Sequence, residues 1–106
     1  MTKNITSEES SRTYHPHIFY KGIEEPRQIT VTTYCSDNSG NPVKESDPTF
    51  THYEATWAEA NRKDVHKRIG LEYMQCLSFE EAYEKARQVI QEDLWKKLGP
   101  EYSIKD

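Results

Sequence analysis

The stretch from Ser78 to Gly99 has the clearest structural pattern in this sequence. Ser78 and Glu81 have the spacing of a capping box, in which each side chain bonds the backbone N–H of the other. Apolar residues then recur every three or four positions, as they do along one side of a helix: Phe79, Ala82, Tyr83, Ala86, Val89, Ile90 and Leu94. Gly99 and Pro100 end the pattern, because proline lacks the N–H that a continuing helix needs. The sequence therefore predicts a helix at about 79–98 that must cover an apolar surface.

A β-hairpin at about 16–35 can supply that surface. In "RQITVTTYC", residues 27–35, apolar and small residues alternate with polar ones, which is typical of a strand with one buried face. An aromatic and β-branched run at about 16–21 precedes it, and only "GIEEPR" separates the two. Such a short link favours antiparallel pairing of the two strands.

The next part of the sequence allows more than one interpretation. Thr51 and Glu54 repeat the capping-box spacing. Apolar residues follow at helical spacing: Trp57, Ala58, Val65 and Ile69. We therefore expect a second helix at about 52–69, although alternating residues also allow a strand at 50–58, and a further strand at 71–77 is open as well. With any of these, the expected fold class is α+β, a small antiparallel β-sheet packed by the C-terminal helix.

Polar ends flank a single predicted domain at 14–99. Residues 1–13 are rich in Ser, Thr and Glu and predict a flexible N-terminal tail, and residues 100–106 predict a short C-terminal tail. Residues 36–48 consist largely of turn-forming types and predict an exposed loop.

Two cysteines, Cys35 and Cys76, indicate the expected compartment. The start of the chain lacks the apolar centre of a signal peptide, and no apolar run is long enough to span a membrane. We therefore expect a cytoplasmic protein with free thiols. The cysteines do not form a CxxC motif and the four histidines do not form an HxxxH motif, so we expect neither a metal site nor a cofactor.

No sequence motif for catalysis is present, and this favours a binding function. The chain has no G-x-S-x-G motif and no glycine-rich phosphate loop. We expect a small, soluble, non-catalytic binding module that docks on a larger protein as an inhibitor, adaptor or accessory subunit. Tyrosine, tryptophan and arginine are enriched in binding hot spots, and we expect charged residues on the outer face of the 52–69 helix. The predicted contact residues are Tyr20, Tyr34, Arg62, Lys63, His66, Lys67 and Trp95, together with the loop at 36–48.

Two alternatives belong to other functional classes. The stretch 62–68 holds four Lys or Arg residues and one Asp, so it could contact nucleic-acid phosphates together with aromatic residues of the sheet. The net charge of −4 gives no general support for that reading. The second alternative is a small enzyme that uses His66, or Cys76 with its thiol activated by the helix N-terminus that follows.

Overall fold

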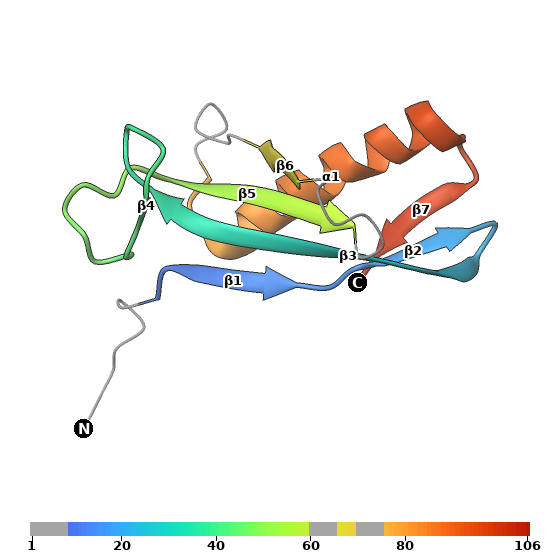
Figure 1. The fold of residues 1–106 in the computed structure, drawn as a ribbon, viewed down its shortest axis with the longest axis horizontal. Coiled ribbons are helices and arrows are strands. Elements are labelled where there is room, and N and C mark those ends of the chain that lie inside the picture. Colours follow the sequence, from blue (N-terminus) through green and yellow to red (C-terminus); the bar gives the residue numbers. More distant parts are fainter. Residues whose placement is uncertain (1–8, 60–65, 70–75) are drawn as a thin grey trace, which may run out of the picture.

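One helix packs on one face of an antiparallel β-sheet, forming two layers (Figure 1). The computed structural model describes residues 9–59, 66–69 and 76–106. Its elements are β1 (Ser11–Tyr14), β2 (His17–Tyr20), β3 (Ile23–Ser36), β4 (Pro42–Val43), β5 (His52–Glu59), β6 (His66–Ile69), α1 (Phe79–Leu98) and β7 (Tyr102–Lys105). The predicted α+β class is confirmed.

The long strand β3 is the centre of the sheet. β5 pairs with it over eight registered positions, from Ile29 opposite Glu59 to Ser36 opposite His52. On the other side, β2 pairs with the first half of β3 and β1 with the second half. β6 and β7 extend the sheet outside β5 and β2, giving the order β6-β5-β3-β2-β7. The β2–β3 pairing confirms the predicted hairpin at about 16–35.

The alternation read in residues 27–35 decides which face of the sheet is buried. The core-facing strand residues are Ile18, Ile29, Val31, Cys35, Tyr53, Ala55, Trp57 and Ile104. The helix adds its predicted stripe, of which Phe79, Ala82, Tyr83, Ala86, Ile90 and Leu94 are buried. Small Ala side chains at two positions of this stripe allow the helix to lie close to the sheet.

The start of α1 is close to the prediction. The Ser78 hydroxyl accepts a hydrogen bond from the Glu81 backbone N–H at 3.0 Å. The Glu81 carboxylate, however, accepts from the backbone N–H of Leu77 rather than from that of Ser78. Lys96 and Lys97 lie in the last turn, where the helix dipole favours positive charge.

The predicted second helix at 52–69 is wrong. Residues 52–59 form β5 and residues 66–69 form β6, so the alternative strand at 50–58 was the better interpretation. Thr51 and Glu54, which suggested a capping box, both bond the imidazole of His52 instead. The eight-residue pairing with β3 outweighs local helix propensity, because aromatic and β-branched residues suit a half-buried strand. The other alternative, a strand at 71–77, lies largely outside the described residues.

The predicted tails also need correction. Residues 11–14 pair with β3 as β1, and residues 102–105 pair with β2 as β7. Ile104, placed in the C-terminal tail by the sequence, is 4% exposed and belongs to the core. The predicted loop at 36–48 includes β4, which pairs with the end of β3. These short segments gain their order from strand pairing, which local composition does not reveal.

Candidate functional site

Five exposed or half-exposed apolar residues gather at one end of the molecule. We call this surface the aromatic end; it consists of Tyr20, Ile23, Trp95, Leu98 and Tyr102. The β2–β3 turn, the end of α1 and the start of β7 meet there, at the right of Figure 1. The backbone N–H of Lys21 donates to the carbonyl oxygen of Glu101 at 3.0 Å and so joins the turn to the segment before β7.

The sharp turn between β2 and β3 requires unusual backbone angles. Gly22 has φ +81° and Lys21 has φ +53°, in the left-handed region that glycine adopts without strain. Tyr20 and Ile23 lie opposite each other across this turn. The turn therefore presents both side chains at the tip of the hairpin.

Tyr102 holds the aromatic side chains in place. Its ring packs on that of Tyr20 with the centroids 4.8 Å apart, and its carbonyl oxygen accepts a hydrogen bond from Trp95 Nε1 at 2.8 Å. The rings remain accessible, since Tyr20 is 38% and Trp95 48% exposed. A fixed but exposed aromatic side chain loses little conformational freedom when it is buried by a partner.

The outer edge of β7 is covered by side chains of α1. The Gln91 amide donates to the Tyr102 carbonyl oxygen at 3.0 Å and accepts from the Ile104 N–H at 2.9 Å, as a neighbouring strand would. Beside it lies an open depression of about 260 Å³ whose lining includes Arg87, Gln91 and Trp95. Because the edge is occupied, a partner at this end meets side chains rather than a free strand.

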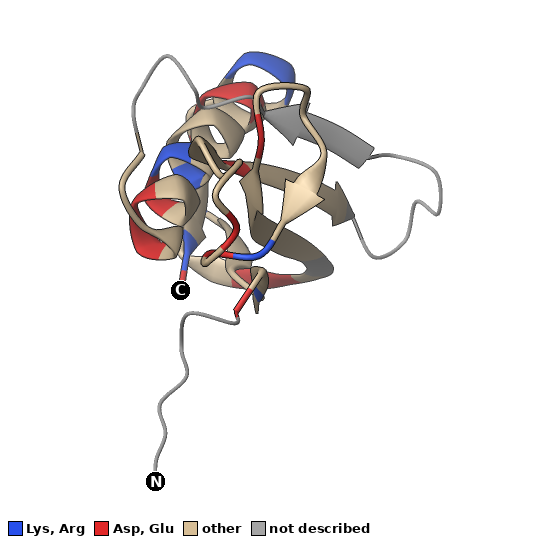
Figure 2. Cartoon of the chain, turned by 90° about the vertical axis from the view of Figure 1, so that its left-hand side faces the viewer, with Lys and Arg blue, Asp and Glu red and all other residues tan. Residues whose placement is uncertain are grey.

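Lysines border the aromatic end. Lys21 Nζ lies 5.4 Å from the centroid of the Tyr20 ring, a cation–π distance. Lys96 is exposed in the last turn of α1, and Lys97 forms an ion pair with Asp93 at 3.3 Å. Along the rest of α1 acidic and basic residues both occur, as the red and blue stretches of the helix in Figure 2 show. The described part of the chain therefore has an apolar end bordered by Lys21 and Lys96, with the exposed acidic residue Glu101 nearby, and mixed charge along the helix.

The structure unites only some of the predicted contact residues. Tyr20 and Trp95 meet at the aromatic end through Tyr102. Tyr34 is distant from them in the fold: it lies in the second half of β3 and its hydroxyl donates to Glu54 Oε1 at 3.2 Å.

The described part of the basic stretch does not have the predicted helical geometry. Arg62 and Lys63 lie outside the described residues, and His66 and Lys67 belong to β6, at the sheet edge opposite β7. Because residues 66–69 form a strand, the helix that would have grouped His66 with Lys67 is not present there.

Sequence reasoning missed Ile23, Leu98 and Tyr102. Each lies at one end of an element. Ile23 begins β3 directly after Gly22, Leu98 ends α1 directly before Gly99, and Tyr102 begins β7. The sequence signal that could have predicted them is an apolar residue directly beside a turn or a helix end, because side chains at the ends of elements are incompletely buried.

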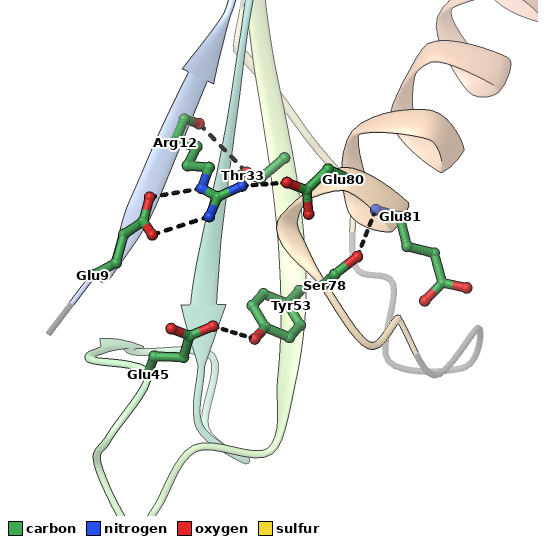
Figure 3. Close-up of polar contacts among 8 residues, drawn as sticks. All are labelled: Glu9, Arg12, Thr33, Glu45, Tyr53, Ser78, Glu80 and Glu81. Carbon is green, nitrogen blue, oxygen red and sulfur yellow. Dashed lines mark hydrogen bonds and ion pairs between the residues drawn. The ribbon is translucent and has the colours of Figure 1, made fainter. Parts of the chain in front are cut away.

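A polar cluster fixes β1 to the start of α1 (Figure 3). The Arg12 guanidinium contacts both carboxylate oxygens of Glu9, at 2.6 and 3.1 Å, and also bonds Glu80. Its centre lies 4.8 Å from the centroid of the Phe79 ring. The hydrogen bond from Arg12 lowers the pKa of Glu9. We assign this cluster a structural role, because its charged groups bond one another.

Both cysteines are buried and free. Burial raises the pKa of the Cys35 thiol to about 11, with a further contribution from Glu45. Burial also raises the pKa of Cys76, opposite to the activation expected from the following helix. The geometry therefore gives no support to Cys76 as a nucleophile. Among the described residues, no group of three or more His, Cys, Asp or Glu side chains could hold a metal ion.

Comparisons with known proteins do not identify a family or a function for this chain. No family model, no curated protein and no solved structure matched the chain significantly. Within the part of the chain that the structure describes, no helix is both long and apolar enough to cross a membrane.

Proposed function

We propose that this protein is a protein-binding module whose aromatic end docks on a larger protein, as an inhibitor, adaptor or accessory subunit. The observation that carries the proposal is Trp95, which is held by a hydrogen bond to Tyr102 and yet is 48% exposed. Buried, free cysteines agree with a reducing compartment, and we place the interaction in the cytoplasm.

The side chains of the aromatic end are suited to a binding hot spot. Trp and Tyr supply large contact areas, and truncating such an anchor typically costs about 2 kcal/mol or more of binding free energy. Leu98 and Ile23, 45% and 73% exposed, extend the apolar area around the aromatic rings. Their burial in an interface would remove this surface from water.

Two lysines at the aromatic end support a partner with acidic groups. Lys21 lies beside Tyr20, and Lys96 follows Trp95 directly. We infer that the partner has an apolar pocket for Trp95 with carboxylates on its rim. Complementary rim charges mainly accelerate association, so raising the salt concentration should slow association more than it speeds dissociation.

The test is capture from a lysate of the protein's own source, with and without nuclease treatment, using three tagged baits. They are the wild type, a Trp95→Ala/Leu98→Ala variant, and Leu77→Ala as the matched control. Leu77 is 81% exposed and precedes α1, whereas the aromatic end lies at its far end. Circular dichroism would establish that all three baits fold.

We expect one stoichiometric protein on the wild type and the control, bound at least about 30-fold more weakly by the double variant. A Lys21→Glu/Lys96→Glu variant should lower the association rate of the same protein. Equal capture by the double variant and the wild type would contradict the proposal. Capture that disappears with nuclease would instead favour nucleic-acid binding through the stretch 62–68.

A further inference from the structure

A hydrogen-bonded chain of polar side chains lies where β5 begins, on the sheet face away from α1. Thr51 Oγ1 is 2.7 Å from His52 Nδ1, and His52 Nε2 is 2.8 Å from Glu54 Oε2. The hydroxyl of Tyr34, on the neighbouring strand, donates to the other oxygen of Glu54 at 3.2 Å. The intervening Tyr53 faces the core, so its neighbours in the strand occupy the opposite face.

The positions of the protons follow from the partners of His52. The Glu54 side chain is 4% and that of His52 11% exposed, so both are largely removed from water. When Glu54 is a carboxylate, which only accepts hydrogen bonds, the ring proton of a neutral His52 lies on Nε2. Nδ1 then has its lone pair directed at Thr51 Oγ1. The Thr51 hydroxyl also reaches the carbonyl oxygen of Ser36, but at the longer distance of 3.1 Å.

The hydroxyl end of this chain is open to small molecules. Thr51 is exposed and lines an open cavity of about 390 Å³. The other lining residues are Asp37, Asn38, Ser39, Pro48 and Thr49. Asn38 and Ser39 bring amide and hydroxyl groups that can donate to a carbonyl oxygen. The Thr51 hydroxyl, the His52 base and the Glu54 carboxylate that orients this base therefore form a hydrogen-bonded chain, and its hydroxyl end lies beside a space for a ligand.

We propose that Thr51 is a covalent modification site that accepts an acyl group from small activated esters. Thr51 Oγ1 attacks the ester carbonyl carbon, and the Oγ1–carbon bond forms as the bond from that carbon to the leaving oxygen breaks. The Thr51 proton passes to His52 Nδ1 and from there to the leaving oxygen, or to solvent when the leaving group departs as a phenolate. Glu54 is a positioning residue, since it orients His52 and stabilises the imidazolium. This site is separate from the aromatic end and does not depend on the docking function.

The probe is p-nitrophenyl acetate, with peptide mass mapping of the acetylated protein. The wild type should gain an acetyl ester on Thr51 that hydroxylamine removes, whereas acetyl amides on lysines persist. Thr49 is the internal control, because it lines the same cavity but its hydroxyl bonds Asp47 at 2.6 Å rather than a base of the histidine type. Thr51→Val should abolish the ester, and Thr49→Val should leave its rate unchanged.

His52→Gln separates general-base activation from simple exposure of the hydroxyl. Positioned general bases typically accelerate proton transfer about 10²–10⁴-fold, so the Thr51 ester should form at least about 100-fold more slowly in this variant. Thr51 labelling no faster than that of Thr49, or an unchanged rate in folded His52→Gln, would overturn the assignment. Loss of ester formation would leave the docking test unaffected, so failures of the two proposals are distinguishable.

Discussion

Replacing Gln91 by alanine tests how the aromatic end is held in place. The Gln91 side chain forms two hydrogen bonds with β7, to the Tyr102 carbonyl oxygen and from the Ile104 N–H. Tyr102 keeps its second donor, Trp95, but the Ile104 N–H loses this acceptor in a residue that is only 4% exposed. The substitution therefore removes a substitute for strand pairing and creates no large cavity.

The expected cost of Gln91→Ala follows from these two bonds. Each contributes about 0.5–1.5 kcal/mol net, and an unsatisfied buried donor adds to the loss. Alanine recovers a few tenths of a kcal/mol through its higher helix propensity. We expect the free energy of unfolding to fall by about 1–2 kcal/mol, which corresponds to a lower Tm by roughly 5–10 °C in a domain of this size.

Urea denaturation and amide hydrogen exchange together measure this effect. Gln88→Ala is the matched control, because Gln88 is exposed on the same helix and carries the same side chain. The control should change stability by less than about 0.5 kcal/mol. Exchange at the Ile104 amide should accelerate in Gln91→Ala alone. Equal stability of the two variants, with an equally protected Ile104 amide, would refute the assigned role of Gln91.

Three further predictions concern the core residue Ile104, the thiol of Cys35 and the carboxylate of Asp37. Ile104→Ala should destabilise the fold by about 2–5 kcal/mol in urea titrations, while the same change at exposed Ile23 should cost less than about 0.5 kcal/mol; equal effects would contradict a core role for the C-terminal strand. Cys35, with its pKa raised to about 11, should react with a thiol reagent at pH 8 about 100-fold more slowly in the native protein than in urea, and a fast native reaction would be at odds with its burial. Hydrogen bonds from the backbone of Asn41 and neighbouring residues lower the pKa of Asp37, so its contribution to stability is present above the ordinary Asp pKa of about 3.9 and is lost as the pH falls through the lower folded value. The stability difference between wild type and Asp37→Asn should therefore shrink below about pH 4, and a constant difference would exclude this linkage.

Local patterns predicted the elements that are stabilised largely by their own sequence. The helix at 79–98 has a cap, a continuous apolar stripe and a stop, and these signals agree with one another. The strand at 27–35 has an unbroken alternation that matches its buried face. Both were correct because local propensity and tertiary packing favour the same conformation.

β5 was assigned to the wrong class because two local signals competed with one distant partner. Thr51 and Glu54 have helix-cap spacing, yet both side chains form hydrogen bonds with His52, and Glu54 also accepts one from Tyr34. The deciding interaction is the ladder with β3, whose partners are separated by up to 30 positions in the sequence. The two four-residue strands at the chain ends were missed for the same reason.

The candidate surface was predicted in its residue types but not in its arrangement. Aromatic residues are common at interfaces, which predicts Tyr20 and Trp95 as contact residues, whereas their meeting through Tyr102 depends on the pairing of β2 with β7. The pair His52 and Glu54 was not recognised, since two residues at i and i+2 share a face only in a strand.

Site-specific photo-crosslinking tests the docking proposal most directly. A photoreactive residue replaces Leu98, at the aromatic end, or Thr30, on the sheet face away from α1 as the control position. Both proteins are irradiated in nuclease-treated lysate of their source. The proposal predicts one crosslinked protein from position 98, lost on addition of excess unlabelled wild type but not of excess Trp95→Ala/Leu98→Ala, and none from position 30. Crosslinks from position 30 alone, or competition by the double variant as effective as by the wild type, would contradict it.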